Sequence, residues 1–167
     1  MQQGHEHHQT AGNSMDDAAM MRSHYRMLAL NLAISLAIMY FVMFAMINSL
    51  GEFIQNVNFF YMALMMWAPM GSLMLLMMSG MYKNKRLNMA LHAIFALVLV
   101  LSFLATRQQW LVGDKQFLRS MIPHHSGAIL MCREATIRDA EIKRLCGEII
   151  PAQQREIDEM KQIMARM

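Results

Sequence analysis

The chain has 167 residues, of which 56% are hydrophobic and only 16% are charged, a composition unlike that of an ordinary soluble domain. Methionine alone supplies 22 residues; it is a flexible apolar filler, and its thioether sulfur also suits soft metal ions. The formal net charge of +3 is small and scattered along the chain, which argues against a nucleic-acid-binding surface.

The first 25 residues are polar and contain His5, His7 and His8 together with several methionines. We expect residues 1–25 to form a disordered tail, which could either collect metal ions with low specificity or be merely solvated.

Three apolar segments follow, within a membrane region of residues 26–108. They cover residues 27–50, 59–82 and 87–106, and each has the roughly 20 apolar residues that a helix needs to cross a bilayer. The first segment is too long for the core of a signal peptide and lacks a small-residue cleavage pattern, so it is expected to be retained as an anchor. The sequence therefore predicts three transmembrane helices and a lipid bilayer as a partner.

Positive residues gather on one side of these spans. Three lie in the short connection of residues 83–86, and Arg22 and Arg26 precede the first span on the same side. The positive-inside rule then places the N-terminus and this connection in the cytoplasm. With three crossings, we expect the C-terminal segment to face the periplasm or the exterior of a bacterial inner (plasma) membrane.

Residues 109–167 are expected to form a helical domain facing water. Asp114 and Asp139 are suitable N-caps for two helices, the first ending near residue 137, and Pro123 and Pro151 should kink or interrupt them. No segment shows convincing strand alternation, so the predicted fold class is all-α. Two short helices bury little surface, and we therefore expect a homodimer or higher homo-oligomer in which two hairpins complete a four-helix bundle.

The two predicted helices carry apolar stripes with the 4-3 spacing of a helix bundle. On the second helix the stripe runs through Cys146, Ile150, Gln153, Ile157, Met160, Met164 and Met167. The first helix has two neighbouring stripes: Leu118, Ile122, His125, Ile129 and Cys132 form one, and Phe117, Met121, His124, Ala128 and Met131 form the other.

Cys132 and Cys146 are equally far from the turn near Asp139, so a hairpin should place them level and facing each other. Three interpretations remain open. They could form a disulfide in an oxidising compartment, bind Cu(I) as a soft dithiolate, or simply pack as small buried residues.

The most informative motif lies on the first helix of this domain. Met121 precedes His124 by three residues and His125 by four, so the three side chains crowd one surface of a helix. A thioether is a poor ligand for most metals but suits Cu(I), and imidazole suits copper in either oxidation state. Gln153 and Glu156 on the second helix are candidates to orient an imidazole.

Residues 114–163 resemble the domain of unknown function 305 family, through F-L-R-S-M-I-P-H-H-S-G-A-I-L-M at 117–131 and I-I-P-A-Q-Q-R-E-I-D-E-M at 149–160. The resemblance implies a ferritin-like four-helix bundle, and copper binding through Met and His in some members. Carried over by position, it implicates five metal ligands: Met121, His124, His125, Met131 and Met160. The chain differs from the family pattern in having one helical pair and an attached membrane region, which favours a dimer.

The sequence therefore predicts a membrane-anchored copper-binding protein that captures, buffers or hands on Cu(I), with Cu(II) and Ag(I) as other possible ions and a copper-donating or copper-accepting protein as a possible partner. Catalytic motifs such as G-x-S-x-G, a P-loop or H-E-x-x-H are absent from the sequence, so we expect no enzyme.

Two other functions compete with this one. The second span resembles that of the eukaryotic Ctr copper transporters, because methionine recurs at Met62, Met66, Met70, Met74 and Met78, which could form a copper-conducting ridge in an oligomer. The other alternative is a membrane anchor or scaffold subunit in which the His and Met side chains only pack.

Overall fold

The structure, a computed structural model, describes the backbone of residues 3–167 and the side chains of residues 19–167. This part of the chain is all-helical, as predicted, with no strand. Its elements are five α-helices and two short 3-10 helices: α1 (Gln3–Val42), η1 (Met43–Met46), η2 (Leu50–Glu52), α2 (Val57–Met77), α3 (Lys85–Gln108), α4 (Asp114–Glu134) and α5 (Ala140–Ala165).

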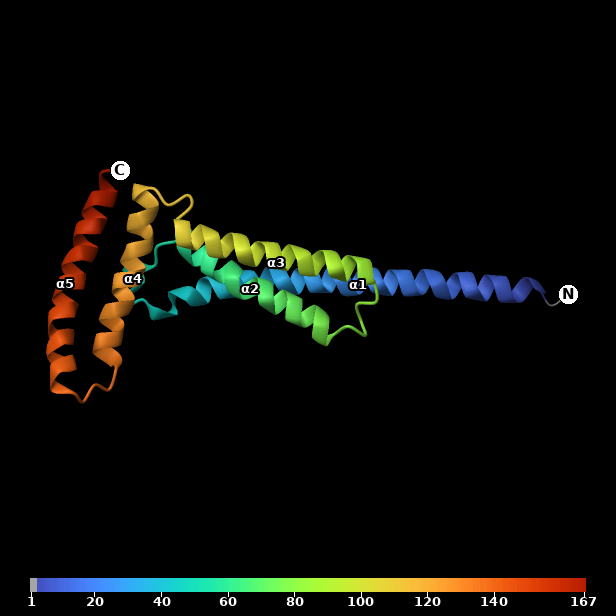
Figure 1. Cartoon of the computed structure of the whole chain (residues 1–167), viewed down its shortest axis with the longest axis horizontal. Coiled ribbons are helices and arrows are strands. Elements are labelled where there is room, and N and C mark those ends of the chain that lie inside the picture. Colours follow the sequence, from blue (N-terminus) through green and yellow to red (C-terminus); the bar gives the residue numbers. More distant parts are fainter. Residues whose placement is uncertain (1–2) are drawn as a thin grey trace.

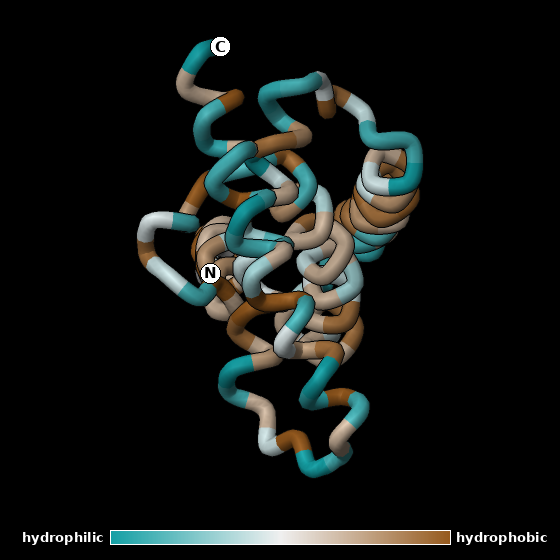
Figure 2. The backbone as a smooth tube through the Cα atoms, turned by 90° about the vertical axis from the view of Figure 1, so that its left-hand side faces the viewer, coloured by the Kyte–Doolittle hydropathy of each residue, from teal (hydrophilic) through white to brown (hydrophobic). Residues whose placement is uncertain are grey.

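The helices are arranged as an elongated bundle crossed by a hairpin. Helices α1, α2 and α3 run along the long axis, and the α4–α5 hairpin lies across one end of them, while the N-terminal part of α1 extends beyond the other end (Figure 1). Seen from the hairpin side, hydrophilic residues are most frequent on the hairpin and its turn, and hydrophobic residues predominate in the bundle behind it (Figure 2).

Three helices are long and apolar enough to cross a membrane. They cover Ala19–Met46, Val57–Met77 and Lys85–Gln108, and only 17% to 28% of the residues in their most apolar windows are buried inside the protein. Apolar helices that leave most of their side chains uncovered are suited to lipid rather than to water. The three predicted spans are therefore confirmed as membrane-compatible helices.

The first span differs from its prediction at both ends. Residues 3–25 were expected to be disordered, but their backbone is helical and continuous with the span. The segment is polar, but extending an existing helix avoids the cost of a new nucleus. At the other end, the helix stops at Val42 rather than near residue 50, and η2 begins with a capping box in which Ser49 and Glu52 bond each other's backbone.

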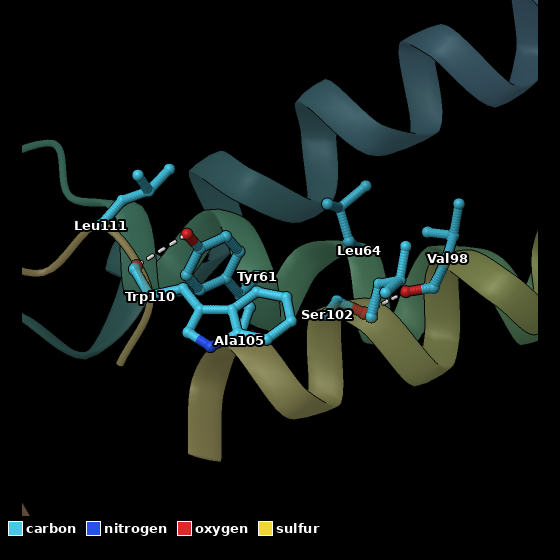
Figure 3. Close-up of a pocket in the computed structure, with 8 residues that line it drawn as sticks. Tyr61, Leu64, Val98, Ser102, Ala105, Trp110 and Leu111 are labelled. Carbon is cyan, nitrogen blue, oxygen red and sulfur yellow. Dashed lines mark hydrogen bonds between the residues drawn. The ribbon is translucent and has the colours of Figure 1, made fainter. Parts of the chain in front are cut away.

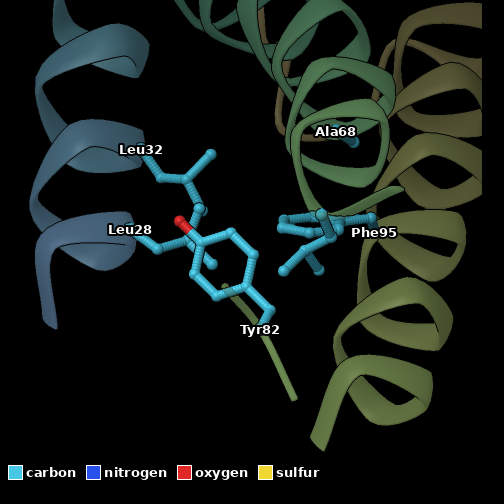
Figure 4. Packing of buried hydrophobic residues seen from close by; sticks show 6 residues of the cluster. Leu28, Leu32, Ala68, Tyr82 and Phe95 are labelled. Atoms are coloured by element: carbon cyan, nitrogen blue, oxygen red, sulfur yellow. The ribbon is translucent and has the colours of Figure 1, made fainter. Parts of the chain in front are cut away.

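The bundle core lies toward the end with the 83–86 connection. Leu28 and Leu32 of α1 face Phe95 of α3, with Tyr82 beside them (Figure 4). Burial, and to a smaller extent the neighbouring Tyr25, raises the pKa of Tyr82 above its usual value.

Two hydrogen bonds fix α1 against the α2–α3 pair. The Tyr25 hydroxyl donates to Asn88 Oδ1 at 2.7 Å, and Trp67 Nε1 donates to the Leu32 carbonyl oxygen at 2.7 Å. The first of these bonds brings the segment around Tyr25 to the start of α3. The positive residues of both segments, on which the orientation prediction rests, therefore lie at the same end of the bundle.

Helix α3 lies close to the backbone of α2 at Gly71. A Cβ atom added there would lie 2.6 Å from Phe95 Cζ and 2.8 Å from Phe95 Cε1, so the ring would have to move.

We expect Gly71→Ala to cost roughly 1–3 kcal/mol in packing, partly offset by about 1 kcal/mol from the better helix propensity of Ala. A thermal melt of the detergent-solubilised protein would measure this loss. Gly80→Ala is the matched control, because a Cβ there meets no atom within 4 Å; equal melting temperatures for the two variants would contradict the assigned contact.

Candidate metal centre

The site residues lie on the α4–α5 hairpin, whose ends differ slightly from those predicted. The N-cap of α4 is Gly113, so Asp114 is the first helical residue, where its negative charge still favours the helix N-terminus. Asp139 caps α5 as predicted, accepting hydrogen bonds from the backbone N–H groups of Glu141 and Ile142 at 2.9 and 3.0 Å. Helix α4 ends at Glu134, and neither helix restarts at its proline: Pro123 and Pro151 lie inside α4 and α5.

The predicted stripes describe how the two helices pack. Leu118, Ile122 and Ile129 of α4 are buried together with Ile157 and Met160 of α5 in one apolar cluster. Met121, Ile150, Ile163 and Met164 pack around this cluster. The second α4 stripe lies beside the buried one and remains largely open to solvent.

A disulfide joins the two helices near their turn. Cys132 and Cys146 are bonded, with their Cα atoms 5.3 Å apart, and no cysteine is free. The sequence left three interpretations open: a disulfide, a Cu(I) dithiolate and simple packing. The structure contains the disulfide. The closed loop stabilises a hairpin that is otherwise too small to bury much surface.

His125 is held on both sides of its ring. It is buried, with Nδ1 lying 2.9 Å from the Met121 carbonyl oxygen and Nε2 lying 2.6 Å from Glu156 Oε2. Glu156 therefore does orient an imidazole, as predicted. A metal ion can reach Nε2 only by displacing Glu156 from it.

The five predicted ligands divide between the inside and the outside of the hairpin. His125 and Met160 are buried, Met121 is half-buried, and His124 and Met131 are exposed. The rings of His124 and His125 have centroids 6.1 Å apart and planes inclined by 64°. One chain thus places Met121, His124 and Met131 on one open stripe of α4, but it does not bring all five side chains together.

The described part of the chain contains no cluster of the side chains that most often bind metals. Within residues 19–167, no three His, Cys, Asp or Glu side chains are placed so that they could hold a metal ion.

The contacts that dock α4 onto the membrane bundle were not predicted from the sequence. The fully buried Ser126 donates its hydroxyl to Glu52 and accepts a hydrogen bond from the Asn48 N–H at 2.6 Å. Arg133 Nη1 donates to Asn48 Oδ1 at 3.0 Å, and a Cβ added to Gly127 would lie 3.4 Å from the Met46 carbonyl oxygen. The sequence does contain one indication of such a contact. Glu52 is the only acidic residue between Asp17 and Asp114, and a lone carboxylate in an apolar region usually has a specific partner.

A second connection holds the start of α4. The Tyr61 hydroxyl of α2 donates to the Trp110 carbonyl oxygen at 2.8 Å, in the tight link after α3 where Gln109 and Leu111 have positive φ (Figure 3). The groove beside this bond is about 510 Å³ and lined almost entirely by apolar side chains of α2 and α3. Its lining carries no ligand set for a metal, and its composition suits lipid chains.

Two comparisons with known proteins bear on this hairpin. The family model described as "Domain of unknown function (DUF305)" matches residues 102–164, which include α4 and nearly all of α5. "Uncharacterized protein L153" of Acanthamoeba polyphaga mimivirus is 35% identical over 119 residues, which cover 70% of this chain and 76% of the relative. The chain belongs to the DUF305 family. The similarity to the viral relative is longer than the DUF305 segment, so it extends into the membrane-spanning part. No solved structure matches the chain.

Proposed function

We propose that this DUF305 protein captures Cu(I), and its chemical analogue Ag(I), outside the cytosol and buffers the ion or hands it to another protein. The observation that carries the proposal is the open stripe of α4, on which Met121, His124 and Met131 follow one another at helical spacing. Thioether and neutral imidazole are the donors that suit a soft monovalent ion.

The proposed ligands have different tasks. His124 is exposed and binds first, together with the Met121 thioether one turn before it. Met131 lies seven residues after His124, about 10 Å along the helix axis, so it contributes its thioether to an ion held by the partner copy of the chain. His125 joins when copper displaces Glu156 from Nε2. Met160 is buried among apolar side chains, and its main role is to support Met121 from the opposite helix.

A second copy of the chain completes the coordination shell. The stripe Phe117, Met121, His124, Ala128 and Met131 has bundle spacing, yet Phe117 and Met131 are about half exposed. Packing this stripe against its counterpart in another chain makes a four-helix bundle and places two sets of Met and His donors in one interface. The homodimer is therefore part of the proposal.

The proposed location is a bacterial inner membrane with the hairpin in the periplasm. Two independent features support a hairpin outside the cytosol. Disulfides such as Cys132–Cys146 persist mainly in oxidising compartments. The positive residues of the 83–86 connection lie at the opposite end of the bundle from the hairpin, which is the expected arrangement when that connection is cytoplasmic.

The alternative copper path along the second span is less well supported by the packing. Met70 and Met74 pack against the bundle core, whereas Met62, Met66 and Met78 are exposed. The methionines of α2 thus face different surroundings, and we place copper on the hairpin for this reason.

A Cu(I) competition titration of the full chain in detergent tests the proposal. The number of ions retained against a chromophoric Cu(I) chelator is expected to fall in His124→Ala/His125→Ala, with residual hairpin binding weakened on the order of tenfold or more. His92→Ala is the matched control, because His92 is hydrogen-bonded to Ser72 within the membrane region. Undiminished copper retention by the double variant would contradict the hairpin site, and no retention by any form would favour a scaffold.

A further inference from the structure

A second group of sulfur and imidazole donors lies at the other end of the bundle. Met20, Met21 and His24 of α1 line a pocket of about 480 Å³ together with Met81 of the α2–α3 connection. We propose that this pocket is a separate binding site for a soft monovalent cation, Cu(I) or Ag(I), with these four side chains as its ligands. It goes beyond the proposed hairpin function and does not depend on it.

The two halves of this pocket are held together by neighbouring side chains. Tyr25 follows His24 and Tyr82 follows Met81, and the two tyrosine rings have centroids 5.3 Å apart. Tyr25 also donates its hydroxyl to Asn88 at the start of α3. The donors on α1 and Met81 are about 60 positions apart in the chain. The tyrosine contact and the Tyr25–Asn88 hydrogen bond hold them next to each other.

His24 points to a ligand that the protein does not itself provide. Its Nδ1 atom is buried and has no hydrogen-bond partner among the described residues. Leaving a buried polar atom unpaired costs about 1–3 kcal/mol, so such atoms usually have a partner in the functional state. On α1, Met20 and Met21 lie four and three residues before His24, which places both thioethers on the helix surface next to the imidazole.

The remaining lining residues define the class of ion. No carboxylate of residues 19–167, whose side chains the structure describes, lines the pocket, so these residues offer hard divalent cations such as Ca²⁺ and Mg²⁺ none of their preferred ligands. Asn84 is already used, because its Oδ1 accepts the Leu87 N–H at 3.1 Å as the N-cap of α3. Lys83 also lines the pocket, and its positive charge opposes a doubly charged ion more strongly than a singly charged one. Three thioethers and one imidazole suit a monovalent soft ion.

Methyl NMR of the full chain, labelled at the methionine methyl groups and titrated with Ag(I) in detergent, locates the ion directly. The methyl signals of Met20, Met21 and Met81 are expected to shift together and to saturate. Met27 and Met89 are the internal controls, because they are more exposed (64% and 72%) and do not line the pocket. Unshifted signals from Met20, Met21 and Met81, or equal shifts at all exposed methionines, would overturn the proposal.

Variants distinguish this site from the hairpin site. His24→Ala and Met81→Leu are each expected to lose the pocket ion in the Cu(I) competition titration, whereas Met27→Leu keeps it. The two sites lie at opposite ends of the bundle, so they should lose their ions independently (Figure 1). Adding His24→Ala to His124→Ala/His125→Ala is therefore expected to remove the pocket ion just as it does in the otherwise native chain. An unchanged ion count in His24→Ala and Met81→Leu would overturn the pocket site alone, whatever the hairpin variants show.

Discussion

Cys132→Ser is expected to lower the free energy of unfolding of the hairpin by about 3 kcal/mol, the largest effect of any single substitution considered for this chain. The two cysteines are 14 residues apart in sequence, and their bond joins the last turn of α4 to the first turns of α5. Without it, the unfolded hairpin gains chain entropy, while the folded hairpin loses no apolar contact of comparable size. Proteolysis at the 135–139 turn during a denaturant titration of the full chain would measure the change.

Reduction supplies the control for this prediction. A reducing agent should destabilise the native protein to the level of Cys132→Ser and should leave the variant itself unchanged. If the native protein and the variant unfold at the same denaturant concentration under oxidising conditions, the disulfide does not hold the hairpin. Cells that keep these cysteines oxidised would, in addition, support a hairpin outside the cytosol.

Glu52→Ala is expected to release the hairpin from the bundle at a cost of about 1–3 kcal/mol, because Ser126 then loses the acceptor of its buried hydroxyl. Glu52 also accepts the Ser49 N–H at 3.0 Å, so the substitution loosens the link between α1 and α2 as well. Hydrogen exchange of residues 43–56 and of α4 would measure the release. Glu148→Ala is the matched control: Glu148 pairs with Arg144 on the open surface, and its loss should change stability by less than about 0.5 kcal/mol.

A double-mutant cycle tests the contact itself. If Glu52 acts through Ser126, Glu52→Ala and Ser126→Ala are non-additive, and the double variant is little worse than the more damaging single one. Additive losses would mean that the two side chains contribute independently, and the docking contact would then have to be reassigned.

Local sequence patterns predicted much of the fold. The three spans follow from long apolar runs, and the inner stripe of α4 follows from the helical period, since Leu118, Ile122 and Ile129 are buried as that stripe requires. Asp139 was predicted as a cap because an N-cap depends on bonds to the next few residues only.

Features that depend on distant contacts were not predicted. The burial of Glu52 depends on where α4 docks, because its partner Ser126 lies 74 positions further along the chain. The end of α1 at Val42 likewise lies next to the segment on which α4 docks. The same limit applies to the candidate ligands. Helical spacing put His125 on the stripe that is buried and His124 on the neighbouring one, and Glu156 was a candidate to orient an imidazole. That Glu156 holds His125 rather than His124 depends on how α5 packs against α4.

X-ray absorption at the copper edge tests the central claim most directly. The sample is the full chain carrying His24→Ala and loaded with Cu(I), so that only the hairpin ion contributes to the signal. We predict a shell with both sulfur and nitrogen neighbours, from which Met121→Leu/Met131→Leu removes the sulfur. A shell without sulfur, or a sulfur signal that survives this double substitution, would contradict copper binding by the open stripe of α4.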